Sequence, residues 1–160
     1  FQIQTGEIRA RGVEVEARAS VYDNLDLVAA YTYTDAEVTK SNGVDLGKRP
    51  PVVPRHTASL WAHYTFRTGM LSGLGLGAGV RYVGGGAGDP GNTFSTSDYT
   101  LVDAAISYDF AAADPALKGW RLQVNAQNLF DKEYISGCYG TTQCSFGLRR
   151  TVLATLSYRW

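Results

Sequence analysis

The chain has only two cysteines, Cys138 and Cys144, which stand six positions apart near its C-terminus. Five intervening residues let the chain turn back and bring the two sulfur atoms together, so a disulfide is the favoured chemistry. A protein metal site would need further ligands nearby, and no His, Asp or Glu lies between Tyr134 and Trp160. A closed loop this small contributes about 2 to 3 kcal/mol, so we expect the bond to fix local shape.

The other residues able to do chemistry do not gather into a catalytic site. His56 and His63 are seven positions apart, an odd separation that places them on opposite faces of a strand. Asp103 and Asp109 would lie about 20 Å apart along one strand, too far for an acid–base pair. The Gly-x-Gly-x-Gly segment at 75–79 has no helix after it, so it predicts free space beside a strand and no nucleotide loop. We therefore expect no enzyme.

Seven segments that would position these residues alternate between apolar and polar side chains, the pattern of β-strands with two different faces. Most are about 10 to 14 residues long, and about 9 to 11 tilted strand residues cross a bilayer. No apolar run approaches the roughly 18 residues of a transmembrane helix. The segments are 12–22, 25–38, 54–67, 73–83, 101–110, 120–127 and 151–160.

Aromatic side chains gather near the ends of the apolar faces, for example at Tyr31, Tyr33, Tyr158 and Trp160. Aromatic girdles at the two surfaces of a bilayer have this distribution. The opposite faces are polar, and that of the first segment carries Glu16. These features favour a transmembrane β-barrel over a soluble β-sandwich, whose strands are seldom so long.

The connections between the segments are alternately short and long, which is typical of periplasmic turns and extracellular loops. Seven crossings are an odd number, whereas bacterial single-chain barrels have an even number, and an open edge leaves backbone groups unpaired in lipid. We therefore predict an all-β, antiparallel transmembrane barrel of which residues 1–160 form the C-terminal part. The first residues lack a basic start and an apolar core, so we expect no signal peptide there.

The composition agrees with this prediction. Lys plus Arg and Asp plus Glu number 15 each, which gives no basic face for nucleic acid. Aromatic residues make up 12% of the chain, which argues against disorder.

Several segments resemble strand motifs of TonB-dependent outer-membrane receptors, and the resemblance covers essentially the whole chain. The strongest is Asn128–Tyr134, and the others are 6–17, 31–37, 54–56 with 59–61, 79–84 and 155–160. The ferric hydroxamate (ferrichrome-type) receptors are the most similar branch, because of Gly88–Pro90, Asn92, Phe94 and the loop between the cysteines.

This resemblance implies a barrel of about 22 strands filled by an N-terminal plug. The chain would supply its last seven strands, without the plug and the earlier strands. The implied function is TonB-dependent uptake of a ferric siderophore, of hydroxamate type, across the bacterial outer membrane. The siderophore brings its own iron ligands, so neither a cofactor nor a protein metal site is implied. The implied partners are the ferric siderophore, TonB through the absent N-terminal region, and outer-membrane lipid with lipopolysaccharide.

The resemblance also implies roles for three residues. Tyr139 and Phe146 flank the cysteine loop and would pack on the carbon framework of the siderophore. Glu16 would face arginines of the plug from the wall of the lumen. Without the resemblance, the two aromatics would be ordinary loop residues and Glu16 a solvated wall carboxylate.

Two other functions stay open at this point. A receptor of this kind could carry another cargo, such as a catecholate siderophore, haem or a cobalamin. Alternatively, the chain could form a small structural or adhesive outer-membrane barrel by itself, although seven crossings count against this.

Overall fold

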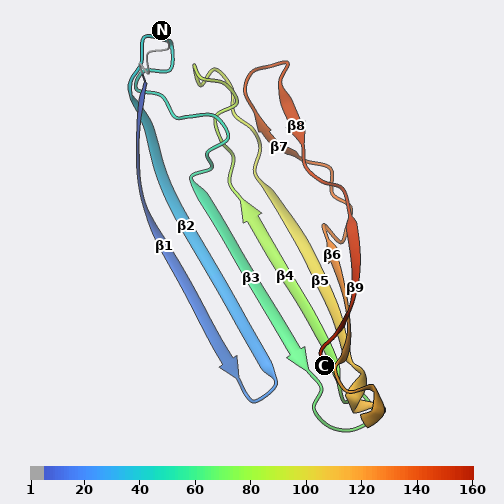
Figure 1. Cartoon of the computed structure of the whole chain (residues 1–160). Helices are drawn as coiled ribbons and strands as arrows, with labels where there is room; N and C mark the ends of the chain where they lie inside the picture. The colour runs from blue at the N-terminus through green and yellow to red at the C-terminus, as the bar shows by residue number, and fades with distance from the viewer. Residues whose placement is uncertain (1–5) are drawn as a thin grey trace.

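The chain forms one antiparallel sheet of seven strands (Figure 1), which confirms the predicted all-β class. The computed structural model describes residues 6–160. Residues 1–5, which belong to the stretch where we expect no signal peptide, lie outside the described part. The order in the sheet follows the sequence, with β9 beside β6. The strands are β1 (Glu7–Val21), β2 (Leu25–Lys40), β3 (His56–Thr65), β4 (Leu74–Val83), β5 (Tyr99–Asp109), β6 (Trp120–Gln127) and β9 (Thr151–Tyr158).

Two connections contain further short elements. A hairpin of β7 (Ile135–Cys138) and β8 (Cys144–Phe146) stands between β6 and β9. The β5–β6 turn holds two 3₁₀ helices, η1 (Phe110–Ala112) and η2 (Pro115–Leu117). Sequence patterns predict only loops here, because elements of 3 or 4 residues are too short for a period to show. Among residues 6–160, no helix has the length and apolar character needed to cross a membrane.

The two ends of the sheet differ in the length of their connections. Figure 1 shows the long connections at one end and the short turns, with the C-terminus, at the other. We call these the loop end and the turn end. The long connections are residues 41–55, 84–98 and 128–150, which confirms the predicted alternation of short and long connections.

The sheet has one apolar and one polar face. Directly paired residues share a face, and Val15 pairs with Tyr31 on the apolar face as Glu16 pairs with Ala30 on the polar face. Large apolar side chains are open on the apolar face: Leu76, Ile106 and Leu156 are 41%, 52% and 58% exposed. A water-soluble domain would bury such residues, so this face requires an apolar environment.

At the loop end the polarity of the two faces is inverted. The alternation predicts a strand start at Gly12, whereas β1 begins at Glu7 because its pairing with β2 continues. There the otherwise apolar face carries Arg9, while Ala36 and Val38 on the opposite face are only 6% and 5% exposed. Because charged residues replace apolar ones on this face, the apolar alternation does not show the part of β1 that precedes Gly12.

Glycines on the polar face of β4 make room for side chains of β3. Trp61 pairs with Gly79, and His63 pairs with Gly77. A Cβ atom at Gly77 or at Gly79 would collide with the indole ring of Trp61. The ring therefore spans both glycines, and the free space expected at 75–79 is occupied by side chains of the sheet itself.

Candidate functional site

The connection between β6 and β9 is fastened at its base by Asn128. This residue is 3% exposed and adopts a positive φ of 50°, which Asn tolerates better than most residues. Its amide nitrogen donates to the carbonyl oxygens of Lys132, at 2.8 Å, and Leu148, at 3.0 Å. Its amide oxygen accepts from the Lys132 backbone N–H at 2.8 Å. One side chain thus joins the outgoing and returning segments of the connection.

Asp131 makes a second link across the same base. Its carboxylate accepts from Arg149 Nε at 2.9 Å, from Arg149 Nη2 at 2.6 Å and from the Arg150 backbone N–H at 2.9 Å. Arg149 also pairs with Glu133. Hydrogen bonding to Arg149 holds the pKa of the Asp131 carboxyl far below its usual range and raises the pKa of Arg149. We call Asn128, Asp131 and Arg149 the loop anchor.

The loop anchor is connected to the polar face of the sheet through Asp103. This carboxylate accepts two hydrogen bonds from Arg81, at 2.5 and 3.0 Å, and one from the Asn128 backbone N–H at 2.9 Å. The Asp103 side chain is only 13% exposed. Sequence reasoning assigns Arg81 and Asp103 merely to the wall, because nothing in the spacing shows that Asp103 meets Asn128.

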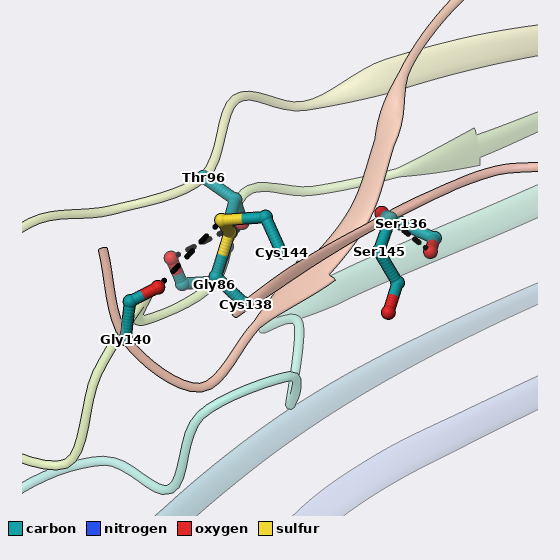
Figure 2. Close-up of a disulfide and its surroundings, with 7 residues drawn as sticks. All are labelled: Gly86, Thr96, Ser136, Cys138, Gly140, Cys144 and Ser145. Carbon is teal, nitrogen blue, oxygen red and sulfur yellow. Dashed lines mark hydrogen bonds between the residues drawn. A yellow bond between two sulfur atoms is a disulfide. The ribbon is translucent and has the colours of Figure 1, made fainter. Parts of the chain in front are cut away.

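The tip of the same connection is closed by a disulfide between Cys138 and Cys144 (Figure 2). Cys138 is 1% exposed whereas Cys144 is exposed, so only the Cys138 side of the bond is buried. Figure 2 draws it together with the β4–β5 loop, where Gly86 N–H donates to the Thr96 hydroxyl at 3.1 Å. Gly137 packs so closely on Val52 that a Cβ would collide with it. The hairpin therefore contacts the 41–55 connection at Val52, and its Ser136 lines a small pocket together with Gly86 and Thr96 of the β4–β5 loop.

A pocket of about 350 Å³ lies between this connection and the start of β5. The Tyr99 and Tyr134 rings have centroids 4.3 Å apart, and Phe146 completes its aromatic lining. Tyr99 pairs with Val83, which places it on the polar face with Arg81 and Asp103. The remaining lining residues are Ser97, Asp98, Lys132, Glu133 and Ile135. We call this the aromatic pocket.

The structure separates the residues that the sequence predicts for binding. Phe146 lines the aromatic pocket, whereas Tyr139 stands on the hairpin tip, 64% exposed, and does not line it. Glu16 lies on β1, at the far edge of the sheet from β9, and its carboxylate accepts from Arg18 Nε at 2.7 Å. Among residues 6–160, no three His, Cys, Asp or Glu side chains cluster as metal ligands.

Sequence reasoning misses Tyr99 and Tyr134 as pocket residues. Tyr99 lies on the same face of β5 as Leu101 and Asp103, which is the polar face. An aromatic residue on that face is the signal that could have found it. Tyr134 closes the 128–134 motif, but its partner lies 35 positions away in sequence. No local pattern joins two such residues.

The apolar face, the polar face and the gathering of loops at one end define a section of the wall of a transmembrane β-barrel. The TonB dependent receptor-like, beta-barrel family matches residues 1–129. The chain belongs to this family, and the protein is located in the bacterial outer membrane. The apolar face is thus the lipid-facing outer face of the wall, and the polar face lines the lumen.

Relatives of the chain are siderophore receptors. It is 49% identical over 160 residues to the ferrichrome outer membrane transporter/phage receptor of Escherichia coli strain K12, covering 100% of this chain and 21% of that protein. It is 42% identical to the ferrioxamine B receptor of Salmonella typhimurium strain LT2, covering 96% of this chain and 22% of that protein. The chain thus spans about a fifth of the length of these relatives.

A solved structure has the same fold. The crystal structure of the siderophore receptor PiuA from Acinetobacter baumannii superposes with a TM-score of 0.74 at 30% identity. The match covers 96% of this chain and 22% of that one. The family is one of receptors and transporters and not of enzymes.

Proposed function

We propose that the receptor containing this chain takes up a ferric siderophore of hydroxamate type across the outer membrane, in a TonB-dependent manner. The observation that carries the proposal is the aromatic pocket, which lies at the loop end and is lined by Tyr99 of the polar face. The similarity to a ferrichrome transporter and a ferrioxamine B receptor supports the hydroxamate class. The chain contributes wall, three long connections and part of the mouth.

The chemistry of this step is binding and passage, with no covalent bond formed. Aromatic rings pack on the carbon framework of a ligand, while a few polar groups fix its orientation. Phe146 with Tyr99 and Tyr134 supplies the rings, and Lys132 and Glu133 supply the polar groups. The iron keeps the oxygen ligands of its siderophore, so the proposal asks for no metal ligand or cofactor in the protein.

Tyr139 has a different part in this proposal. Its exposure on the hairpin tip lets it contact a siderophore before the ligand reaches the aromatic pocket. The disulfide restrains the backbone on both sides of it, which lowers the entropy lost when the tip orders on a ligand.

Glu16 supports the proposal of a plug inside the barrel, N-terminal to these strands and linked to TonB. The carboxylate lies on the lumen face and its partner Arg18 is 76% exposed, so a plug arginine can compete for it. A charge pair enclosed between wall and plug is screened less than one on an open surface.

The cargo class is tested by binding to the intact receptor. We expect a ferric hydroxamate to bind and a ferric catecholate to bind at least about a hundredfold more weakly. Equilibrium quenching of tryptophan fluorescence measures both, with haem and a cobalamin as further ligands. Binding of the catecholate, haem or the cobalamin without the hydroxamate would reject the proposed cargo.

A further inference from the structure

The connection between β2 and β3 contains an Asn–Gly pair, Asn42–Gly43, close to its start. A glycine after Asn leaves the next backbone nitrogen unshielded, because no Cβ stands beside it. That nitrogen can attack the Asn side-chain amide and close a succinimide ring. The other asparagines precede Leu, Thr or Ala, and they are Asn24, Asn92, Asn125 and Asn128. Asn42 is therefore the asparagine whose neighbouring nitrogen is least hindered.

The side chain of Asn42 is also less restrained than those of other asparagines. Asn42 and Gly43 are both exposed at the loop end. Among residues 6–160, hydrogen bonds hold the amides of Asn92 and Asn128, whereas none holds the amide of Asn42. A fixed amide must break its bonds before it reacts, and the amide of Asn42 has no such cost.

Two side chains act on the backbone nitrogen of Gly43. The Gly43 N–H donates to Ser41 Oγ at 3.0 Å, and the Ser41 hydroxyl donates to Asp45 Oδ1 at 2.5 Å. The carboxylate also lies against Gly43 itself, because a Cβ on this residue would be 2.8 Å from Asp45 Oδ1. A proton on the nitrogen can therefore pass through a hydroxyl to a base. We call Ser41 and Asp45 the relay.

The turn that carries the relay is closed by backbone hydrogen bonds. The Val38 N–H donates to the Lys48 carbonyl, and the Gly47 N–H donates to the Val38 carbonyl, both at 2.9 Å. The Lys48 N–H donates to the Asp45 carbonyl, also at 2.9 Å. Groups held in place in this way need not be brought together for each reaction, which lowers the entropic part of the barrier.

We propose that Asn42 is a site of spontaneous deamidation, at which the relay activates the Gly43 nitrogen. The nitrogen bonds to Asn42 Cγ while its proton passes through the Ser41 hydroxyl to Asp45. The bond from Cγ to the side-chain nitrogen then breaks, and this nitrogen takes the proton from Asp45 and departs as ammonia. Water opens the succinimide at either carbonyl carbon. Asn42 and water thus give ammonia and either aspartate or isoaspartate.

The conversion changes both the charge and the backbone of the connection. Aspartate at position 42 adds a negative charge to a connection that also carries Lys48 and Arg49, and isoaspartate adds a backbone carbon as well. The inference does not depend on the proposed cargo, because no residue that lines the aromatic pocket takes part in the reaction.

The test follows Asn42 in the intact receptor, kept at neutral pH and physiological temperature. Trypsin cleaves after Lys40 and Lys48 and releases residues 41–48 as one peptide. Mass spectrometry with chromatographic separation measures the asparagine, aspartate and isoaspartate forms of this peptide over time. Asn92 in the same sample is the internal reference, and we expect it to remain asparagine while Asn42 is converted.

Four variants test the relay. We expect Ser41→Ala and Asp45→Asn each to slow the conversion of Asn42 at least about tenfold, because each removes one member of the proton path. Ser41→Thr keeps the hydroxyl and should convert Asn42 at the rate of the unchanged receptor. Asp23→Asn removes the same charge as Asp45→Asn, but at the turn end, and should also leave the rate unchanged.

Three results would overturn the proposal. The first is an Asn42 that remains asparagine as long as Asn92 does, which would show that no modification site exists. The second is an unchanged rate in either Ser41→Ala or Asp45→Asn, which would remove the relay. The third is a faster conversion in Ser41→Ala, which would show that the hydrogen bond to Ser41 shields the nitrogen.

Discussion

The connection between β6 and β9 is held in different ways at its base and at its tip. At the base, Asn128 is almost completely buried and bonds to backbone groups of both segments. At the tip, a disulfide closes the turn and Tyr139 stands 64% exposed. The two regions therefore have different roles. The hydrogen bonds at the base fix the position of the hairpin, and the disulfide at the tip fixes only its local shape.

The base is expected to be the more sensitive region. Buried hydrogen-bonding groups that lose their partner keep the full cost of desolvation, whereas an exposed tip side chain can be removed into water. Mutations along the connection should therefore have effects on stability that decline from base to tip, while effects on binding should not follow that order.

Asn128→Ala should give the largest effect. It leaves the backbone groups of Lys132 and Leu148 without their partner and puts Ala at a positive φ, which together cost about 2 to 4 kcal/mol. The unfolding midpoint of the intact receptor in urea measures the loss. An unchanged midpoint would show that the base is no more sensitive than the tip.

Asp131→Asn should loosen the connection without unfolding the barrel. The lowered pKa of Asp131 means that its ion pair contributes fully above about pH 4 and is lost only as the pH falls toward the folded value. The variant should show lower amide protection factors in 132–148 at pH 7, and these protection factors should no longer fall as the pH is lowered. Asp23→Asn, in the β1–β2 turn, is the control. If both variants exchange alike, the Arg149 pair does not hold the base.

Phe146→Ala should weaken ferric hydroxamate binding about tenfold, because it removes one aromatic side of the pocket. The amount of receptor in the outer membrane should stay the same. Phe130→Ala is the matched control, since Phe130 is 75% exposed and does not line the aromatic pocket. Equal loss of affinity in both variants would remove the pocket from the binding site.

Tyr139→Ala should weaken siderophore affinity less, by about threefold to fivefold, since Tyr139 does not line the aromatic pocket. Receptor abundance is measured in the same membranes by immunoblotting. Unchanged affinity would exclude Tyr139 as a contact.

Cys138→Ser should give the smallest effect on the receptor as a whole. Insertion into the membrane should survive, while proteolytic nicking within 135–146 should increase. Mass spectrometry of the unreduced natural protein provides an independent check. Two free thiols there would contradict the bond itself.

Much of the fold follows from the sequence because a two-residue period is a local property. Val13 to Val21 and Leu74 to Tyr82 show their strands without knowledge of any partner. The long-range contacts are different. The Asn128–Leu148 hydrogen bond and the Tyr99–Tyr134 pair join residues 20 and 35 positions apart, and only the pairing of β6 with β5 and β9 brings them together.

The site is predictable to a lesser degree for the same reason. The cysteine pair and Phe146 are visible as residue types in one loop, but the pocket needs two further rings from elsewhere. The exchange of polarity between the two faces, seen at Arg9 and Ala36, cannot be read from the sequence for another reason. Alternation continues there, but the face that is buried and the face that is charged have changed places.

The indole of Trp61 affects the shape of the lumen face beside β3 and β4. Because the glycines of β4 let this ring lie along the wall, it projects into the lumen less than an upright ring would. The smallest amino acid on one strand thereby makes room for the largest on the next.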